Sequence, residues 1–352
     1  MLWKVGAAVV ALLAFVVVTG VGPNLPGPKL REALGLADPP PIMKPCVPRP
    51  SGVRSPRTPA PAAGHWRLLP PDPYKRDELR AAAIGDTIYL ANGHGPKTES
   101  ISLVETYDVR SRRYGTAPPT PVPLDHAGMV TYGGDLYLIG GYVNGKESNR
   151  LFRYSPATHR WTELRGMGVA RGAFATAVIG DRLYVAGGSE EIDGTPTGVL
   201  EIYDFKSGRW TQGPDMPTPA QHNAGAAVDG KFYAVGGRRV GDLSLAVAER
   251  FDPVTGRWEE LPPLPLGAGG LAAVAAGGRL LAIAGGDDHE GWVTPAVWAF
   301  DPAAGRWGRL PNLRVARHGH AATVARDRVY VFGGSPCARY GRTGAAESLR
   351  GS

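Results

Sequence analysis

Cysteine is nearly absent from this chain of 352 residues, which has only Cys46 and Cys337. Two thiols can build neither a disulfide-rich scaffold nor a four-thiolate metal site. Lysine is also scarce, because 31 of the 39 basic residues are arginine. The sequence has no zinc-binding helix motif, no nucleophile elbow and no Asn-x-Ser/Thr site. The short motifs that identify many hydrolases are therefore missing.

The folded part of the chain has little net charge. Residues 1–63 carry seven basic and two acidic side chains, so five of the seven net positive charges belong to this N-terminal segment. A nucleic-acid-binding protein usually carries its basic residues on the folded domain. We therefore expect no nucleic-acid partner.

One long hydrophobic run opens the chain. Residues 5–22 contain no charged side chain, and Thr19 is the only polar one. About 20 apolar residues are needed to cross a bilayer, and the run ends without a good signal-peptidase site. We interpret residues 1–22 as a transmembrane anchor or signal segment, with retention favoured over cleavage. The rest of the chain would then be periplasmic or extracellular, anchored to the membrane by this helix.

Proline and glycine are abundant, and they have different distributions. Residues 23–61 contain 12 of the 33 prolines, which predicts an extended stalk. The 49 glycines instead mark a repeat of 47–49 residues. Each repeat has a hydrophobic run that ends in a glycine pair or its equivalent, and the last glycines are Gly93, Gly141, Gly188, Gly237, Gly286 and Gly334.

Each of the first five repeats continues with two aromatic residues, seven positions apart. These pairs are Tyr107 and Tyr114, Tyr154 and Trp161, Tyr203 and Trp210, Phe251 and Trp258, and Phe300 and Trp307. Turn residues lie between the members of each pair, which is typical of a hairpin. The pattern predicts four short strands in each repeat.

The glycine pair, the tyrosine and the tryptophan seven residues later resemble the kelch repeat. The resemblance implies an all-β fold, a six-bladed β-propeller over residues 62–350. The sixth repeat ends before its own fourth strand, and Trp66 lies 48 residues before Tyr114. We therefore predict that a strand at Trp66 closes the last blade.

The two cysteines lie near the ends of this propeller. Cys337 follows the sixth glycine pair, and Cys46 lies 20 residues before Trp66. A disulfide between Cys46 and Cys337 would fasten the stalk to the closing blade in an oxidising compartment. The alternative is two unpaired thiols.

Loops that connect consecutive blades should share one face with the loops after the glycine pairs. Alignment on the turn between the first two strands assigns Arg76, Asp125, Arg171, Gln221, Ala268 and Arg317 to one repeat position. We predict a ligand-binding ring on this face, made of Arg76, Asp125, His126, Arg171, Gln221, His222, Arg238, Asp287, Arg317 and His318. In the alternative interpretation, the arginines belong to the repeat framework and pair with neighbouring blades.

Two classes of function remain open. The first is a non-catalytic propeller that binds a protein or a carbohydrate on this face. The second is a propeller enzyme similar to the sialic-acid mutarotases, although their catalytic Glu and Arg pair has no match by motif here. A copper oxidase of the galactose oxidase type is disfavoured by the positions of the two cysteines. We expect no cofactor and no metal site, and we interpret the acidic residues 287–290 as a solvated loop.

Overall fold

The computed structural model describes residues 65–350 except 193, 242 and 339–340. The predicted anchor (1–22) and stalk (23–61) lie outside the described residues. Within the described ranges, no helix has the length and hydrophobicity needed to span a bilayer. The described part is built from β-strands and loops.

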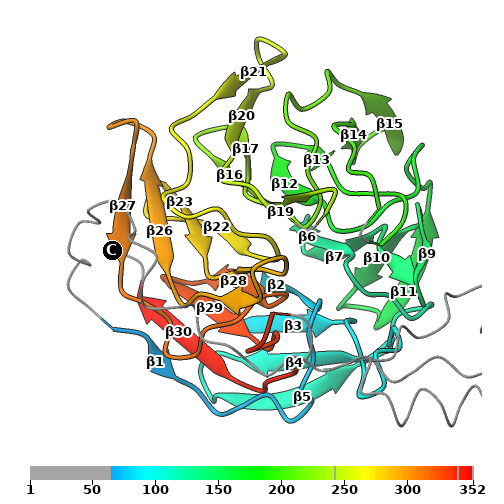
Figure 1. Ribbon diagram of the computed structural model, residues 1–352. Helices are drawn as coiled ribbons and strands as arrows, with labels where there is room; N and C mark the ends of the chain where they lie inside the picture. Colours follow the sequence, from blue (N-terminus) through cyan, green and yellow to red (C-terminus); the bar gives the residue numbers. More distant parts are fainter. Residues whose placement is uncertain (1–64, 193, 242, 339–340, 351–352) are drawn as a thin grey trace, which may run out of the picture. The chain divides into compact units, whose positions relative to one another are not determined.

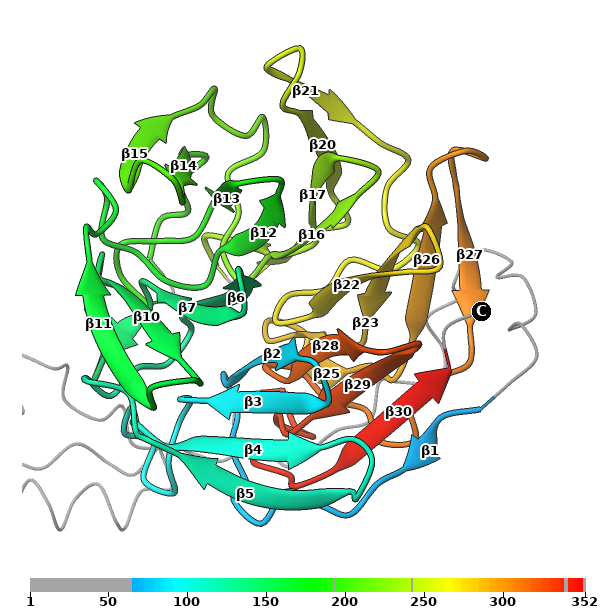
Figure 2. The same cartoon turned by 180° about the vertical axis from the view of Figure 1, so that it is seen from behind.

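Six antiparallel sheets of four strands each surround a central axis in the described residues (Figures 1 and 2). We call them blades 1 to 6 and label the strands of each blade a to d from the axis outward. Blade 1 has Arg80–Ile84 (β2), Thr87–Ala91 (β3), Val104–Asp108 (β4) and Arg113–Ala117 (β5). Blade 2 has Gly128–Tyr132 (β6), Asp135–Ile139 (β7), Leu151–Ser155 (β10) and Arg160–Leu164 (β11). Blade 3 has Ala175–Ile179 (β12), Arg182–Ala186 (β13), Leu200–Asp204 (β14) and Arg209–Gln212 (β15).

The second half of the ring has the same arrangement. Blade 4 has Ala224–Val228 (β16), Lys231–Val235 (β17), Ala248–Asp252 (β20) and Arg257–Glu260 (β21). Blade 5 has Ala272–Ala276 (β22), Arg279–Ile283 (β23), Val297–Asp301 (β26) and Arg306–Leu310 (β27). Blade 6 has Ala321–Ala325 (β28), Arg328–Phe332 (β29), Ala346–Arg350 (β30) and Arg67–Leu68 (β1).

Three of the loops between strands b and c form small hairpins. They pair Tyr142–Val143 (β8) with Lys146–Glu147 (β9), Arg238–Arg239 (β18) with Leu243–Ser244 (β19), and Gly286–Asp287 (β24) with Trp292–Val293 (β25).

The ring closes at the N-terminal strand, as the sequence predicts. Strand β1 pairs with β30 through Arg67 opposite Ser348 and Leu68 opposite Glu347. The Trp66 side chain is buried, and its indole N–H donates to the carbonyl of Pro311 in blade 5 at 2.8 Å. Blade 6 therefore joins the two ends of the folded domain.

The outer edges of all six blades are linked by the same hydrogen bond. The aromatic residue of strand d donates to a carbonyl in the linker that follows the preceding blade. The other five donors and acceptors are Tyr114 to Pro70, Trp161 to Pro118, Trp210 to Arg165, Trp258 to Pro214 and Trp307 to Pro262, at 2.8–3.0 Å. This shared bond explains why the aromatic residue recurs at a fixed place in the repeat.

The glycine pair brings two neighbouring blades into close contact. Both of its positions have positive φ in every blade, and the second N–H donates to a carbonyl of the next blade. A Cβ on Gly187, the first glycine of the pair in blade 3, would lie 2.6 Å from the carbonyl oxygen of Ala220, just before blade 4. In blade 5 the pair is Ala284 and Gly285, with φ of 54° and 102°, so the sequence assignment of its last glycine to Gly286 is wrong by one residue.

A closed ring of backbone hydrogen bonds surrounds the axis just before the strands a. Its six members occupy equivalent positions and have φ between 50° and 60°. Each N–H donates to the carbonyl of the corresponding residue in the preceding blade, at 2.6–3.3 Å. The members are Glu78, His126, Ala173, His222, Gly270 and Gly319. We call this feature the axial ring, and it brings side chains from six different repeats close together.

Candidate functional site

The loops between blades share one face with the loops between strands b and c. In every blade, a backbone bridge joins the two loops across 17 residues of sequence. The bridged pairs are Asp77 with His94, Asp125 with Tyr142, Gly172 with Ser189, Gln221 with Arg238, Gly269 with Gly286, and His318 with Ser335. We call this side of the propeller the loop face.

The bridges correct the sequence alignment in two blades. Asp125 and Gln221 are equivalent to Asp77, so they lie one position beyond the position of Arg76. The error comes from matching charged residues at the turn between strands a and b, because Asp86 lies within its turn whereas Asp135 and Lys231 are the first residues of strand b. In blades 2 and 4 this turn is Gly133–Gly134 and Asp229–Gly230, all with positive φ, as a two-residue hairpin turn requires.

Three predicted arginines do share one position, and all three are buried. In each case the guanidinium reaches a glutamate at the second residue of strand c in its own blade. The pairs are Arg76 with Glu105, Arg171 with Glu201 and Arg317 with Glu347. Further N–H groups donate to backbone carbonyls, for example from Arg171 Nε to Gly187 at 3.0 Å.

These contacts leave the three guanidiniums enclosed within their blades. Arg171 and Arg317 are 0% exposed, and Arg76 is 1% exposed. Their geometry favours the framework role, in which each arginine braces strands b and c beneath the linker. Their role in binding a ligand stays a prediction, without support from this geometry.

The other seven predicted residues are also buried beneath the loop face. Asp125, His126, Gln221, His222, Arg238, Asp287 and His318 are each at most 8% exposed. Arg238 forms an ion pair with Asp288 at 2.8 Å, and Asp287 accepts the backbone N–H of Glu290. The predicted ring therefore exists as an internal polar layer, and a ligand-binding role for it remains untested.

Histidines and carboxylates from blades 1 and 2 form a connected network in this layer. His94 contacts Asp77 at 3.2 Å and Asp125 at 3.5 Å, and Asp125 also contacts His126 Nδ1 at 2.6 Å. Burial disfavours a charged imidazole, but hydrogen bonds to Asp125 and Asp77 raise the pKa of His94 to about 10. Burial likewise opposes ionisation of Asp125, but hydrogen bonds from His126 and His94 hold its pKa well below the usual range.

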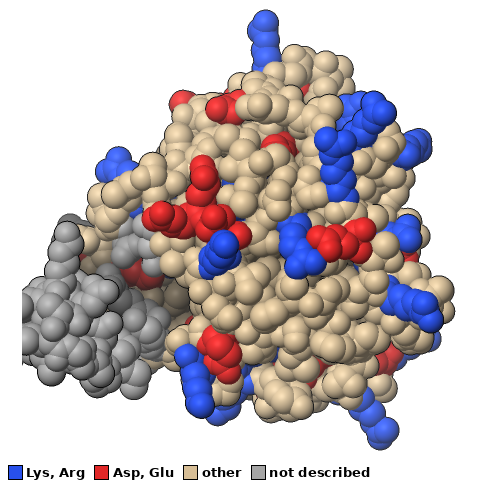
Figure 3. Space-filling view, turned by 90° about the vertical axis from the view of Figure 1, so that its right-hand side faces the viewer, with Lys and Arg blue, Asp and Glu red and all other residues tan. Residues whose placement is uncertain are grey.

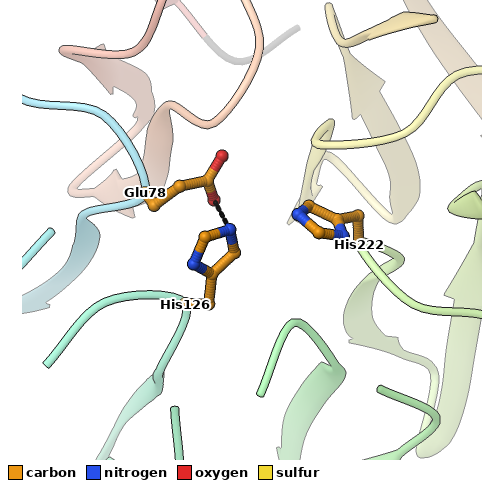
Figure 4. Close-up of side chains that lie close together, drawn as sticks. All are labelled: Glu78, His126 and His222. Atoms are coloured by element: carbon orange, nitrogen blue, oxygen red, sulfur yellow. Dashed lines mark ion pairs between the residues drawn. The ribbon is translucent and has the colours of Figure 1, made fainter. Parts of the chain in front are cut away.

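The network continues to the axial ring, where three side chains converge. Figure 4 shows Glu78, His126 and His222 pointing toward one another from three different blades. Their ligand atoms all lie within 4.8 Å of one another, and all three residues are buried. Burial raises the pKa of the Glu78 carboxyl, but the combined attraction to His126, Arg80, His318 and His94 outweighs burial and lowers this pKa to about 2. Burial and the charge of Arg238 hold the pKa of His222 well below its ordinary value.

Sequence analysis identified His126 and His222 but missed Glu78. The three residues occupy one repeat position, 15 residues before the second glycine of each pair. An alignment counted back from the glycine pair would have placed Glu78 with the two histidines. The alignment instead matched charged residues near the turn between strands a and b, and these do not occupy the same place in every blade.

The predicted disulfide falls partly outside the described residues. Cys337 is buried in the loop after the sixth glycine pair. Cys46 lies among residues 1–64, outside the described part of the chain. The Cys46–Cys337 bridge therefore stays a prediction.

The outer surface is mixed in charge on the side shown in Figure 3. Lysine and arginine side chains are interspersed with aspartate and glutamate, and uncharged surface separates them. This side has no extended area of one sign, in keeping with the low net charge of the folded part.

The chain resembles known proteins over the propeller. Residues 62–215 and 169–334 match the family model described as "KLHDC2/KLHL20/DRC7 Kelch-repeats domain". "Kelch-like protein terF" of Aspergillus terreus is 32% identical over 191 residues, which cover 50% of this chain and 41% of that protein. "Kelch repeat and BTB domain-containing protein 12" of Danio rerio is 29% identical over 199 residues, covering 50% of this chain and 32% of that protein. The chain thus matches less than half of the length of these relatives.

A solved structure has the same architecture. The structure titled "Structure of YjhT" superimposes with a TM-score of 0.67, covering 80% of this chain and 95% of that one. Its sequence identity of 18% shows a shared fold and nothing about activity.

Proposed function

Because the chain belongs to the kelch-repeat family, we propose that its propeller is a non-catalytic module that binds a protein partner on the loop face. The family supports this proposal at the level of the domain, since relatives are named Kelch-like and Kelch repeat and BTB domain-containing proteins. The comparisons give no specific support to the mutarotase alternative or to a carbohydrate ligand. Display outside a membrane is part of the proposal and rests on the hydrophobic run at residues 5–22.

The observation that carries the proposal is a set of exposed apolar side chains on two neighbouring loops of this face. Ile192 lies in the b–c loop of blade 3 and is 39% exposed. Val240 and Leu243 lie in the β18–β19 hairpin of blade 4 and are 61% and 37% exposed. Burial of such side chains against a partner is favourable, and loops held by a rigid scaffold commonly carry binding residues. The polar residues beneath these loops are buried, so the loops themselves present the accessible chemistry.

The test compares charge substitutions on and off this face in the tagged full chain. The partner is captured by cross-linking in cells and identified by mass spectrometry. The double variant Val240→Glu with Leu243→Glu should abolish this capture. Val254→Glu is the matched control, because Val254 is 93% exposed on the turn between β20 and β21. All variants should melt near the wild-type temperature, since exposed substitutions rarely change stability by more than about 0.5 kcal/mol. Equal capture by the wild type and both variants would refute binding through this face.

A further inference from the structure

We propose that Glu78, His126 and His222 form a binding site for one divalent transition-metal ion, of the zinc class, on the propeller axis. Two histidines and one carboxylate are a ligand set that zinc uses in proteins. The three residues come from blades 1, 2 and 4 and are held together by the axial ring.

The separation of the ligand atoms suits a metal ion. His126 Nε2 lies 3.4 Å from Glu78 Oε2. Two ligands about 2.1 Å from a tetrahedral zinc ion stand about 3.4 Å apart. The His222 ring lies 4.8 Å from the His126 ring, centroid to centroid, and the two planes cross at 83°. A small rotation of His222 would bring its free nitrogen into the same coordination sphere.

Hydrogen bonds at the far nitrogens orient both imidazoles for this role. Asp125 accepts a bond from His126 Nδ1 at 2.6 Å, and as an ionised carboxylate it can only accept. Gln221 Nε2 donates to the carbonyl of Gly194, so its Oε1 faces His222 Nδ1, at 3.1 Å. Each Nδ1 therefore carries the proton, and each Nε2 presents a lone pair. Histidine ligands of metals are typically held by such a second bond to an oxygen acceptor.

The centre of the cluster presents three possible ligand atoms to a cation. They are a carboxylate oxygen of Glu78 and the Nε2 atoms of His126 and His222, all from buried residues. The described residues supply no hydrogen-bond donor to His222 Nε2. A cavity of about 10 Å³, lined by Glu78 and His222 among others, adjoins the cluster and has room for about one water molecule. A water molecule there would complete a four-coordinate ion. The competing explanation is a second proton on His126, which would satisfy Glu78 alone and leave His222 unused.

Metal content and cobalt absorption distinguish a metal from a proton. The purified full chain is stripped with a chelator, incubated with Zn²⁺ or Co²⁺, and freed of excess metal. We expect about one Zn²⁺ per chain by elemental analysis, and visible absorption bands of four-coordinate Co²⁺ that Zn²⁺ abolishes. A wild-type chain that retains no metal, or Co²⁺ bands of an octahedral aqua ion only, would overturn the proposal.

Variants place the metal at this cluster. Glu78→Gln and His222→Asn should each weaken Zn²⁺ binding at least tenfold, measured against a chelator of known affinity. Asparagine suits the positive φ of 51° at position 222, so the fold should survive. Asp125→Asn, which changes the orienting acceptor of His126 and also the contacts of Asp125 with His94 and Ser100, should weaken binding by about 10- to 100-fold. His289→Gln, at an exposed histidine of a blade 5 loop, is the control and should bind as the wild type does. Unchanged binding in Glu78→Gln and His222→Asn, with melting temperatures in chelator that show folded protein, would refute the site.

Discussion

Blades 1, 3 and 6 differ from blades 2 and 5 in the side chains that fill one buried space, which lies between the linker before strand a and the second residue of strand c. Blades 1, 3 and 6 place an arginine before strand a and a glutamate in strand c, as in the pair of Arg171 and Glu201. At the same two positions blade 2 has Leu124 and Phe152, which belong to one hydrophobic cluster. Blade 5 has Ala268 and Trp298 there, both buried. The contrast teaches that the fold requires this space to be filled, and that it does not require charge.

Blade 4 combines one feature of each arrangement. It keeps the glutamate of strand c, Glu249, but has Ala220 where Arg171 stands in blade 3. Glu249 is fully buried. Burial raises the pKa of its carboxyl, and neither carboxylate oxygen has a hydrogen-bond partner among the described residues. One repeat therefore retains half of an ion pair.

The largest expected effect comes from breaking one complete ion pair. Arg171→Ala leaves Glu201 buried without its guanidinium, and loss of one partner of a buried pair usually costs about 3–5 kcal/mol. The double variant Arg171→Met with Glu201→Leu imitates the apolar filling of blade 2 and should recover most of that loss. Chemical denaturation of the full chain measures both. A cost below about 1 kcal/mol for Arg171→Ala would mean that the arginine does not brace the blade and would restore it as a candidate ligand-binding residue.

The apolar solution in blade 2 should be nearly as sensitive. Phe152 is 1% exposed, and Phe152→Ala removes a large buried side chain. Such truncations cost about 3–5 kcal/mol, and we expect the lower end here, because the Arg150 guanidinium, rather than another apolar side chain, lies over the Phe152 ring, 4.7 Å from its centroid. Phe152→Leu, which keeps most of the volume, is the control and should lose much less. Equal losses for both substitutions would show that ring shape, rather than filled volume, matters at this position.

Blade 4 offers a gain of stability with a defined pH dependence. A carboxyl group whose pKa is raised on folding destabilises the folded state as the pH rises above its ordinary value near 4.5. Glu249→Gln removes this penalty, so it should stabilise the protein by about 1 kcal/mol at pH 7. The gain should vanish near pH 4, where the carboxyl is protonated in both states. Unfolding curves at the two pH values test this, and a gain that is the same at both would contradict the assigned cause.

The smallest effect concerns the glycine pair of blade 5. Ala284 has a φ of 54°, which costs about 1–2 kcal/mol for a residue with a Cβ. Ala284→Gly removes that strain but gives the unfolded chain more freedom, so the net gain should be about 0.5–1 kcal/mol. Gly188→Ala changes the second glycine of the pair in blade 3. It should be destabilising, because its Cβ would lie 2.4 Å from the carbonyl oxygen of Gly172. Thermal melting of both variants measures the contrast, and a loss in Ala284→Gly would show that its methyl group is needed for packing.

The blade architecture and the closure at Trp66 could be predicted from sequence because their causes are local. Positive φ at the second residue of the glycine pair, the seven-residue spacing of paired aromatics and the hairpin turns each depend on residues close in the chain. The paired aromatic side chains Tyr154 and Trp161 stand opposite each other, as that spacing requires, with ring centroids 5.0 Å apart. The period then fixes how many blades there are and which strand is missing from the last one.

The composition of the candidate site could be decided only by tertiary structure. Arg171 had to be seen beside Glu201, 30 residues away, before its charge could be assigned to the framework of its blade. Glu78, His126 and His222 meet because hydrogen bonds between blades close the axial ring, and no local pattern records those bonds. The turn between strands a and b has two residues in every blade, but its residue types differ, so matching charged residues at this turn shifted the apparent repeat position in blades 2 and 4. The sequence thus determined the strands and turns of each blade. The packing of blades around the axis decided which side chains meet, because the residues that meet lie in different repeats, far apart in the chain.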